Sequence, residues 1–411
     1  MSEPYFQQQF ADRIGGALYG KGTEIYKFEK IKRAKRLALK EHPERHLLDF
    51  GIGENDQMAD ERVRAALKIE CDKIENRGYA DNGIIEYKQA AARFMEREFG
   101  VSLNPESEIN HCIGTKSALA MLPAAFINPG DITLMTTPGY PVAGTHTKYY
   151  GGSVHQLPLV RERDFYPDLD GIPKSVLERA KILVLNYPNS PTGKRASVSF
   201  YQRAIEFAHQ NRIVIVQDAA HIMLSYGEKP LSFLQVPGAR DVGVELHSMS
   251  KGFDMIGWRL GFVAGNPLLV RAFSDVKDNC DSGQFMAIQK AGAVALDNPQ
   301  LPTQVRTRYE RRLKKLVSAL QSIGCNVEMP GGTYFLYVAA PKGIAGGRSF
   351  ASAEESAHFL ITERSVCTVP WDDAGAFLRF STTYQAATEQ DEDQLMTELV
   401  DRLRSSNLVW S

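Results

Sequence analysis

Short apolar runs alternate with amphipathic segments in the middle of the chain, and this alternation constrains the fold more than any other feature. The runs at 182–185, 213–216 and 242–246 have the length of buried strands, and residues 200–210 have the pattern of a helix. Strands that are apolar on both faces and alternate with helices form a parallel sheet covered on both sides. We therefore expect an α/β domain built on such a sheet.

Each of these three strands runs into a polar residue, namely Asn186, Asp218 or Ser248. Ligands of parallel sheets bind beyond the carboxyl ends of the strands. Three successive polar strand ends therefore indicate one cleft. Turns after the predicted strands 109–113 and 133–136, at Gly114 and Tyr140, point to the same cleft.

The turn at Gly114 leads through Thr115, Lys116 and Ser117 into an apolar helix at 118–126. Backbone N–H groups at such a helix start can bind a phosphate. Many strand-to-helix turns bind nothing, so this signal is weak alone.

The stretch ELHSMSKGFDMIGWRLG, residues 245–261, carries the most specific chemistry. Hydroxyls at Ser248 and Ser250 and the guanidinium of Arg259 can bind phosphate oxygens. Lys251 can form a Schiff base with an aldehyde. Pyridoxal 5'-phosphate (PLP) has both groups. The alternative is a polar turn with a solvated lysine.

The segments on either side of this region predict a second unit. Before it, we expect a basic helix at 25–40 with Ile25, Phe28, Ile31 and Leu39 on one face, a strand at 47–50, and helices at 61–77 and 85–99. After it, we expect helices at 267–278, 285–297, 303–323, 353–363 and 389–405, with strands at 326–329, 334–338, 366–369 and 377–381. The predicted division is an arm and part of the small domain at 1–50, a large domain at 51–290 and a small α+β domain at 291–411.

Arg379 lies between apolar neighbours in the last predicted strand. A buried arginine usually pairs with a carboxylate, which is either a side chain of the protein or part of a substrate.

The bulk composition excludes several classes of protein. The chain has 411 residues, enough for two domains, and a net charge of −1, so no overall field attracts nucleic acid or membrane. No apolar run approaches the ~20 residues of a membrane span. The five cysteines are scattered and the nine histidines lack metal-binding spacing, so we expect no metal site and a cytoplasmic protein.

Taken in order, the motifs resemble those of the fold-type I, class I/II aminotransferases over nearly the whole chain. They are Tyr79 with Gly83, Gly114-Thr115-Lys116, Tyr140, NYPNSPTG at 186–193, Asp218, Ser248-Met249-Ser250-Lys251, Arg259 and Arg379. The resemblance implies a large domain with a mainly parallel seven-stranded sheet, and a small α+β domain. The stretches FINPGD, PGYPVAGT, FYPDLDGIP, LSFLQVPGARDVG and VKDNCDSGQF resemble most the LL-diaminopimelate aminotransferase subfamily.

The resemblance also implies PLP as the cofactor and assigns roles. The expected catalytic residues are Lys251, Asp218 and Tyr140. Lys251 is expected to carry the cofactor aldehyde and to move the α-proton. Asp218 is expected to bind the pyridine nitrogen, and Tyr140 to stack on the ring. Thr115, Lys116, Ser248, Ser250 and Arg259 are expected to hold the phosphate. Tyr79 is expected to reach the phosphate in the neighbouring subunit of a homodimer. Arg379 is expected to bind the substrate carboxylate, with Gly53, Lys116 and Asn189 near the substrate.

Two positions depart from the family pattern. Ser190, after Asn189, stands where the family usually has asparagine, and His221 stands where it usually has tyrosine. Both positions normally contact the phenolic oxygen of the cofactor, so we expect Asn189, Ser190 and His221 to lie against it.

The expected reaction transfers an amino group between an amino acid and 2-oxoglutarate, with LL-2,6-diaminopimelate or tetrahydrodipicolinate as the preferred substrate in lysine and cell-wall synthesis. The alternatives are an aspartate- or aromatic-type aminotransferase, or a PLP-dependent lyase or oxidase. A non-catalytic regulatory protein is disfavoured because Lys251, Asp218 and Arg379 are all present.

Overall fold

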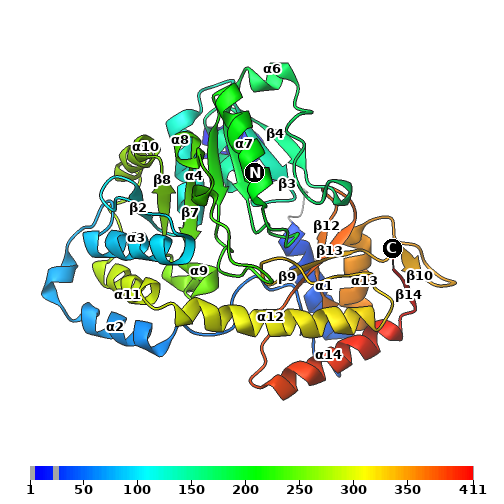
Figure 1. Ribbon diagram of the computed structural model, residues 1–411. Helices are drawn as coiled ribbons and strands as arrows, with labels where there is room; N and C mark the ends of the chain where they lie inside the picture. The colour runs from blue at the N-terminus through cyan, green and yellow to red at the C-terminus, as the bar shows by residue number, and fades with distance from the viewer. Residues whose placement is uncertain (1–4, 22–26, 411) are drawn as a thin grey trace.

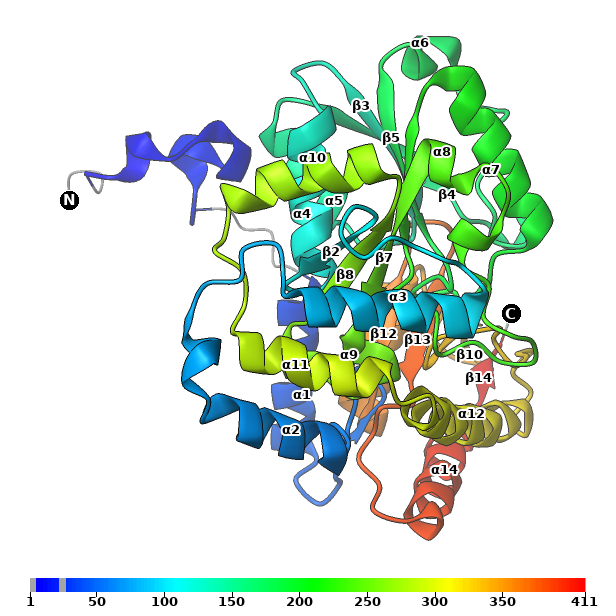
Figure 2. The ribbon, with the colours of Figure 1, turned by 60° about the vertical axis from the view of Figure 1, so that its left-hand side comes forward.

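The computed structural model describes residues 5–21 and 27–410. Two units of secondary structure lie side by side, and the long helix α12 (Gln300–Gln321) runs beneath both (Figure 1). Residues 5–21 form an arm of short turns that projects from the rest of the chain (Figure 2).

A seven-stranded sheet in the order β2-β8-β7-β6-β5-β3-β4 forms the centre of the larger unit. Its strands are β2 (Ile109–Cys112), β3 (Ile132–Thr137), β4 (Ser153–Pro158), β5 (Ala180–Asn186), β6 (Val214–Asp218), β7 (Gly243–Ser248) and β8 (Gly261–Gly265). Within this sheet β8 runs antiparallel to β2 and β7, and the remaining pairs are parallel. The predicted mainly parallel, seven-stranded sheet is therefore confirmed.

Successive strand residues pack into two hydrophobic clusters, one on each face of the sheet. In β5, Ile182 and Val184 join one cluster, and Leu183 and Leu185 join the other. Helices α4 (Thr115–Phe126), α5 (Val142–Tyr149) and α10 (Pro267–Asp278) cover the first face. Helices α3 (Ile85–Phe99), α7 (Val198–Asn211) and α11 (Met286–Leu296) cover the second. Burial on both faces explains why these strands are continuously apolar.

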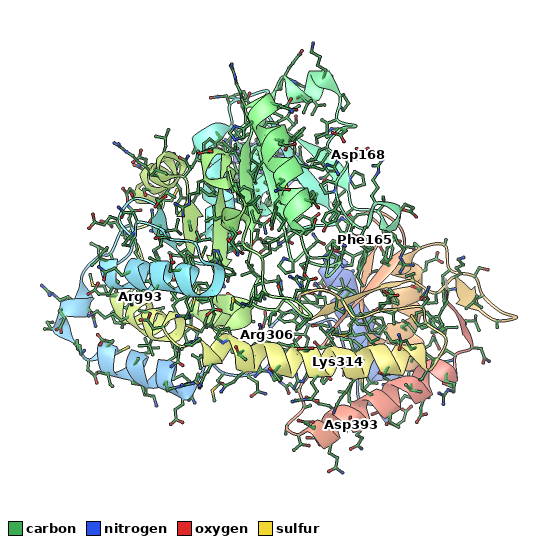
Figure 3. All side chains as sticks on the ribbon, in the orientation of Figure 1. Arg93, Phe165, Asp168, Arg306, Lys314 and Asp393 are labelled. Carbon is green, nitrogen blue, oxygen red and sulfur yellow. The ribbon has the colours of Figure 1, made fainter. Side chains whose placement is uncertain are left out.

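Shorter helices complete the larger unit. They are α2 (Glu61–Cys71), α6 (Lys174–Leu177), α8 (Ala239–Val242) and α9 (Met249–Gly252). The helix predicted at 61–77 was too long, because α2 ends at Cys71 and a separate 3-10 turn follows at Ile74–Arg77. Arg93 on α3 pairs with Asp297 after α11 and lies at the edge of this layer (Figure 3).

The second unit combines segments from both ends of the chain. Its helices are α1 (Lys27–Glu41), α13 (Ala353–Arg364) and α14 (Glu389–Arg404). Its strands are β1 (Leu48–Asp49), β9 (Phe335–Ala339), β10 (Gly343–Ile344), β11 (Val366–Cys367), β12 (Val369–Trp371), β13 (Phe377–Ser381) and β14 (Leu408–Val409). Leu48 and Phe50 share a hydrophobic cluster with these C-terminal elements. The domain boundaries at 50 and 290 stay predictions.

Two sequence predictions for this unit were wrong. Residues 326–329 form no strand. Cys325 and Val327 are buried in alternation with exposed neighbours, as in a strand, but the Val327 carbonyl accepts a hydrogen bond from the side-chain amide of Gln321. Leu39 does not lie on the inner face of α1, since it is 51% exposed while Ile31 and Ala38 are buried. Of the other residues predicted on that face, Ile25 and the side chain of Phe28 lie outside the described part of the chain.

Phe165 lies where the two units meet (Figure 3). Its ring centroid is 6.1 Å from that of Tyr337 on β9 and 6.3 Å from that of Phe377 on β13. Aromatic contacts thus join the loop after β4 to the sheet of the second unit.

Candidate active site

The carboxyl ends of three neighbouring strands bring Asn186, Asp218 and Ser248 to one edge of the sheet. Asn186 and Asp218 are register partners, and the Asn186 side-chain amide donates to the Asp218 carbonyl at 2.9 Å. This closeness follows from the parallel order β7-β6-β5. The sequence-based expectation that these strand ends meet holds in the structure.

Lys251 lies in the short helix α9, directly after β7. Its Nζ donates to the Gly53 carbonyl at 3.0 Å and lies 5.4 Å from the centre of the Tyr334 ring. Burial lowers the pKa of Lys251 to about 8; Arg379 and Arg259 act in the same direction, whereas Glu54 and Asp218 oppose it. An amine with this pKa is partly uncharged near neutral pH, as a nucleophile or base requires.

Asp218 is buried, with 5% of its surface exposed. Its Oδ1 accepts from the Ala220 N–H at 3.1 Å. Burial raises the pKa of Asp218 to about 6, although that N–H and the charges of His247 and Lys251 favour the carboxylate. A cationic ligand group placed beside it would restore the charged form.

A cradle for an anion forms where α4 begins. The Arg259 guanidinium lies so close to Gly114 that a Cβ there would stand 2.5 Å from Nη2. Arg259 Nη1 is 3.4 Å from the Ser250 hydroxyl and 2.9 Å from the Ile256 carbonyl. Thr115 is buried at the first position of α4, and Lys116, next to it, is exposed. Guanidinium, hydroxyl and helix N–H groups together suit a phosphate.

Ser248 caps α9, because its Oγ accepts from the Ser250 N–H at 3.1 Å. The cap orients the first turn of the helix that carries Lys251. An aldehyde joined to a phosphate would find an amine on α9 and, beside it, an anion cradle formed by Ser250, Arg259 and the start of α4.

Arg379, on β13, is 8% exposed and has no ion pair within the described residues. Its Nη2 donates to the Gly51 carbonyl at 3.1 Å, its guanidinium lies 4.1 Å from the Phe335 ring centre, and its buried Nε has no hydrogen-bond partner. Burial lowers the pKa of Arg379 to about 10, so the group stays charged at neutral pH. We predicted that Arg379 pairs with a carboxylate of either the protein or a substrate. No carboxylate side chain among the described residues pairs with it.

His221 is buried between Arg379, Lys251 and two aromatic rings. Its ring centroid is 5.4 Å from that of Tyr334 and 5.8 Å from that of Phe335, and its Nδ1 has no hydrogen-bond partner. Burial, together with the charges of Lys251 and Arg379, lowers the pKa of His221 well below its ordinary value. The imidazole is therefore neutral at physiological pH.

Asn189 and Ser190 lie in the loop after β5. Asn189 Oδ1 accepts from both the N–H and the hydroxyl of Thr192, at 3.1 and 2.8 Å, and its buried Nδ2 has no partner. The Ser190 N–H donates to Asn186 Oδ1 at 2.9 Å. The loop thus offers one unused buried donor.

The two candidate tyrosines are exposed. Tyr140, after β3, is 44% exposed, and Tyr79, before α3, is 83% exposed. No hydrogen bond or ring contact between described residues joins Tyr79 to another candidate residue. The single chain thus brings the other candidates to one edge of the sheet and leaves Tyr79 facing outward.

The sequence reasoning missed Tyr334 and Phe335. The Tyr334 hydroxyl donates to the same Gly53 carbonyl as Lys251, at 2.7 Å, and Phe335 covers the guanidinium of Arg379. The glycine pair before β9, Gly331-Gly332, was the available signal, since glycine allows a close backbone approach.

No group of three or more His, Cys, Asp or Glu side chains able to hold a metal occurs in residues 5–21 and 27–410. In the same ranges, no helix is long and apolar enough to cross a membrane.

Comparison with known proteins supplies the class. The family model of aminotransferase class I and II matches residues 45–402. The chain therefore belongs to the class I and II aminotransferase family, and the predicted enzyme class and fold-type I architecture are confirmed.

Curated relatives narrow the comparison. The LL-diaminopimelate aminotransferases of Methanococcus maripaludis and Methanocaldococcus jannaschii are each 52% identical, over 99% of this chain and 100% of theirs. That of Syntrophobacter fumaroxidans is 36% identical over 98% of this chain and 96% of its own. The predicted subfamily resemblance is confirmed.

Solved structures agree in fold. Substrate-bound BacF from Bacillus subtilis has a TM-score of 0.86 and 29% identity, covering 98% of both chains. A probable N-succinyldiaminopimelate aminotransferase from Thermus thermophilus has a TM-score of 0.82 and 27% identity, covering 93% of this chain and 100% of that one.

Proposed function

We propose that this chain is a PLP-dependent aminotransferase that moves an amino group between LL-2,6-diaminopimelate and 2-oxoglutarate. In the opposite direction it would form LL-diaminopimelate from tetrahydrodipicolinate, in lysine and cell-wall synthesis. The observation that carries the reaction is the set of Lys251, Asp218 and Arg379, which are half-buried or buried so that the pKa of each is shifted, with the buried Nε of Arg379 left without a partner among the described residues. The substrate rests on the 52% identical relatives and their names.

The residues of the candidate site fit PLP. When bound, PLP supplies an aldehyde that takes up an amine and a ring that withdraws electrons from the α-carbon. Thr115 and Lys116 (through their N–H groups), Ser248, Ser250 and Arg259 would hold the phosphate, and Tyr140 would stack on the ring. Asp218 would face the pyridine nitrogen and keep it protonated.

Lys251 and Arg379 would act on the substrate. Arg379 would bind the α-carboxylate through its fork of N–H donors and so fix the α-hydrogen relative to Lys251. The Lys251 amine, with a pKa of about 8, can accept that proton and return it near neutral pH. Gly53, Lys116 and Asn189 would lie near the substrate, and the resemblance also places the arm around residues 19–26 at the distal end of the pocket; residues 22–26 of this arm lie outside the described part of the chain.

Asn189, Ser190 and His221 would surround the phenolic oxygen. A neutral His221 can donate one N–H to that oxygen, and its unpartnered Nδ1 supports this role.

Assembly as a two-fold homodimer with shared active sites is part of the proposal. The 83% exposed Tyr79 would complete the phosphate site of the partner subunit. Other large apolar side chains are exposed nearby in sequence, including Ile69 and Ile74. Sedimentation together with activity assays tests this, because a fully active monomer would contradict it. We also propose a cytoplasmic location, since all five cysteines are free.

The deciding experiment is a panel of amino donors with 2-oxoglutarate, in which glutamate formation is measured. LL-diaminopimelate should give the highest kcat/KM. If aspartate or phenylalanine is better, the substrate proposal fails while the class stands. Loss of the donor without glutamate formation would indicate a lyase or oxidase.

A further inference from the structure

Gln284, between α10 and α11, lies at the junction of the candidate phosphate cradle and the Tyr79 loop (residues 79–83). Its Nε2 donates to the carbonyls of Trp258 and Arg259, at 2.9 Å each. Its Oε1 lies 3.0 Å from His111 Nε2. The two carbonyls fix the orientation of the amide, so Oε1 is left to accept from His111.

On one side, Gln284 holds the main chain of Arg259. Arg259 has a φ of 56°, a left-handed conformation that a non-glycine residue adopts only when its surroundings hold it there. The two bonds from Gln284 fix the carbonyls around this residue. The direction of the Arg259 side chain toward Gly114 and Ser250 therefore depends on Gln284.

On the other side, the neighbour of Gln284 supports the Tyr79 loop. Gly283 forms a bridge with Ala80, and a Cβ at Gly283 would stand 2.0 Å from the Ala80 carbonyl oxygen. At the end of the loop, a Cβ at Gly83 would stand 2.3 Å from the Cβ of His111. The Tyr79 loop therefore packs without free space against Gly283 and His111, the chain neighbour and the hydrogen-bond partner of Gln284.

Further bonds hold the same loop. The buried Lys277 donates to the Asp81 carbonyl and to Asp281 Oδ1, and Asn82 donates to Asp278 Oδ1 at 2.6 Å. Gln289 accepts from the Ile84 N–H at 2.8 Å and donates to the Gln284 carbonyl at 2.7 Å. Tyr79, in contrast, is 83% exposed. A fixed backbone that carries an exposed ring is suited to reach into a second copy of the chain.

We propose that Gln284 is a positioning residue that couples the two active sites of the dimer. This rests on the proposed function, because it requires PLP at Arg259 and Tyr79 in the partner's site. Phosphate binding at Arg259 would strengthen the hold of Gln284 on the Arg259 main chain and, through Gly283, on the Tyr79 loop. The partner's site is then more completely formed before its own cofactor arrives, so PLP binds with positive cooperativity.

PLP titration of the apoenzyme, with visible absorbance as the readout, tests whether PLP binds cooperatively and whether Gln284 is needed for this. Wild type should give a Hill coefficient above 1. Gln284→Ala should give a coefficient of 1 and an about tenfold higher half-saturation concentration, since two hydrogen bonds are lost. Gln284→Glu keeps the acceptor toward His111 but lacks the donor, and should behave like Gln284→Ala. Gln300→Ala, an exposed glutamine at the start of α12, is the matched control and should equal wild type.

Hybrid dimers test coupling between subunits. One subunit is wild type and the other carries Lys251→Ala, with or without Gln284→Ala. Borohydride reduction and mass measurement then report PLP only on the wild-type Lys251. Uptake by that subunit should need about threefold more PLP when the partner carries Gln284→Ala.

Equal uptake in the two hybrids would overturn the inference while leaving the proposed function intact. A wild-type Hill coefficient of 1 would do the same. Wild-type protein that takes up no PLP would overturn the proposed function and this inference with it. Circular dichroism and Tm of each variant separate these outcomes from misfolding; if Gln284→Ala does not fold, Gln284→Glu decides.

Discussion

Arg312 on α12 and Arg379 on β13 are both buried, but their partners differ. Arg312 pairs with Asp56 at 3.0 Å and Glu392 at 2.8 Å, and donates to the carbonyls of Thr382 and Tyr384. Arg379 has the Gly51 carbonyl, the Phe335 ring and, among described residues, no carboxylate. Burial alone therefore does not distinguish the two arginines; the presence or absence of a carboxylate partner among the described residues does.

The contrast extends to the groups around each arginine. The charged brace, which consists of Asp56, Asp254, Arg308, Arg312 and Glu392, pairs its charges with one another along α12, although the buried Nε of Arg308 has no hydrogen-bond partner among the described residues. Asp254, for example, accepts from Arg308 at 2.7 Å and from Asn55 at 2.6 Å. At the candidate site, His221 and Asn189 as well as Arg379 retain buried nitrogens without partners. We expect changes in the brace to affect stability and changes at the site to affect activity.

Lys251→Ala should give the largest effect on activity. Loss of the amine removes both the covalent anchor and the proton acceptor, so the transamination rate should fall by at least about 10⁴-fold. The Tm should change little. The exposed Lys314→Ala on α12 (Figure 3) is the control. Unchanged turnover in Lys251→Ala would refute the proposed mechanism.

Arg312→Ala should give the largest effect on stability. It leaves the buried Asp56 without an ion pair and takes from the buried Glu392 one of its three cationic partners, which should lower the free energy of unfolding by about 3–5 kcal/mol. Urea unfolding measures this. Arg311→Ala, whose more exposed side chain shares Glu392, should cost less. Equal losses in the two variants would remove the distinction drawn for the brace.

Arg379→Ala should have the opposite effect to Arg312→Ala, with a large loss of activity and little loss of stability. The substrate carboxylate loses its ligand, so kcat/KM should fall by about 100- to 1,000-fold. The free energy of unfolding should stay within about 1 kcal/mol of wild type, because no paired charge is left behind. A large loss of stability with normal kinetics would show that Arg379 is structural.

The pH dependence of stability should also separate brace from site. In the apoprotein the pKa of Asp218 is about 6, above its reference value of 3.8, so the folded state binds more protons and stability falls as pH rises from about 4 to 6. Asp218→Asn should remove this loss, about 3 kcal/mol for a shift of about two pKa units. Glu392 has the opposite sign: its pKa is lowered to about 2, so its contribution is lost as pH falls from 4.5 toward 2. Urea unfolding across pH 3–7 tests both; parallel curves for wild type and Asp218→Asn would contradict the first.

His221→Phe should give the smallest effect. PLP should remain bound, but the pH at which its visible absorbance changes should shift by about one unit or less, because one donor to the phenolic oxygen is lost. A spectrophotometric titration of both proteins measures this. Superimposable curves would mean that His221 only packs against Tyr334 and Phe335.

The sequence predicted the parts of the site that depend on strand ends. Asn186, Asp218 and Ser248 follow continuous apolar runs, and parallel pairing brings such ends together. The motif around Lys251 and Arg259 was similarly visible, because it uses side chains at fixed spacing. These features depend on local sequence and on one general rule of sheet topology.

Other parts could not be predicted because they involve backbone atoms or distant segments. The carbonyls of Gly51 and Gly53 bind Arg379 and Lys251, but a main-chain acceptor has no signature in the sequence. Edge strand β4 was missed because only Leu157 of its six residues is buried. Whether Arg379 has a carboxylate partner depends on the packing of β13 against residues more than 300 positions earlier in the chain.

Arg379 lies late in the sequence, so a growing chain contains the other candidate site residues before it contains this arginine. A nascent polypeptide that ends before β13 already contains Lys251, Asp218 and Arg259, and the seven-stranded sheet that positions them. It lacks the guanidinium that would select a carboxylate, and it lacks β13, the central strand of the sheet β12-β13-β9. Because domains fold as they emerge during synthesis, the proposed function implies that the chain would gain the capacity to bind an aldehyde before the capacity to select among amines.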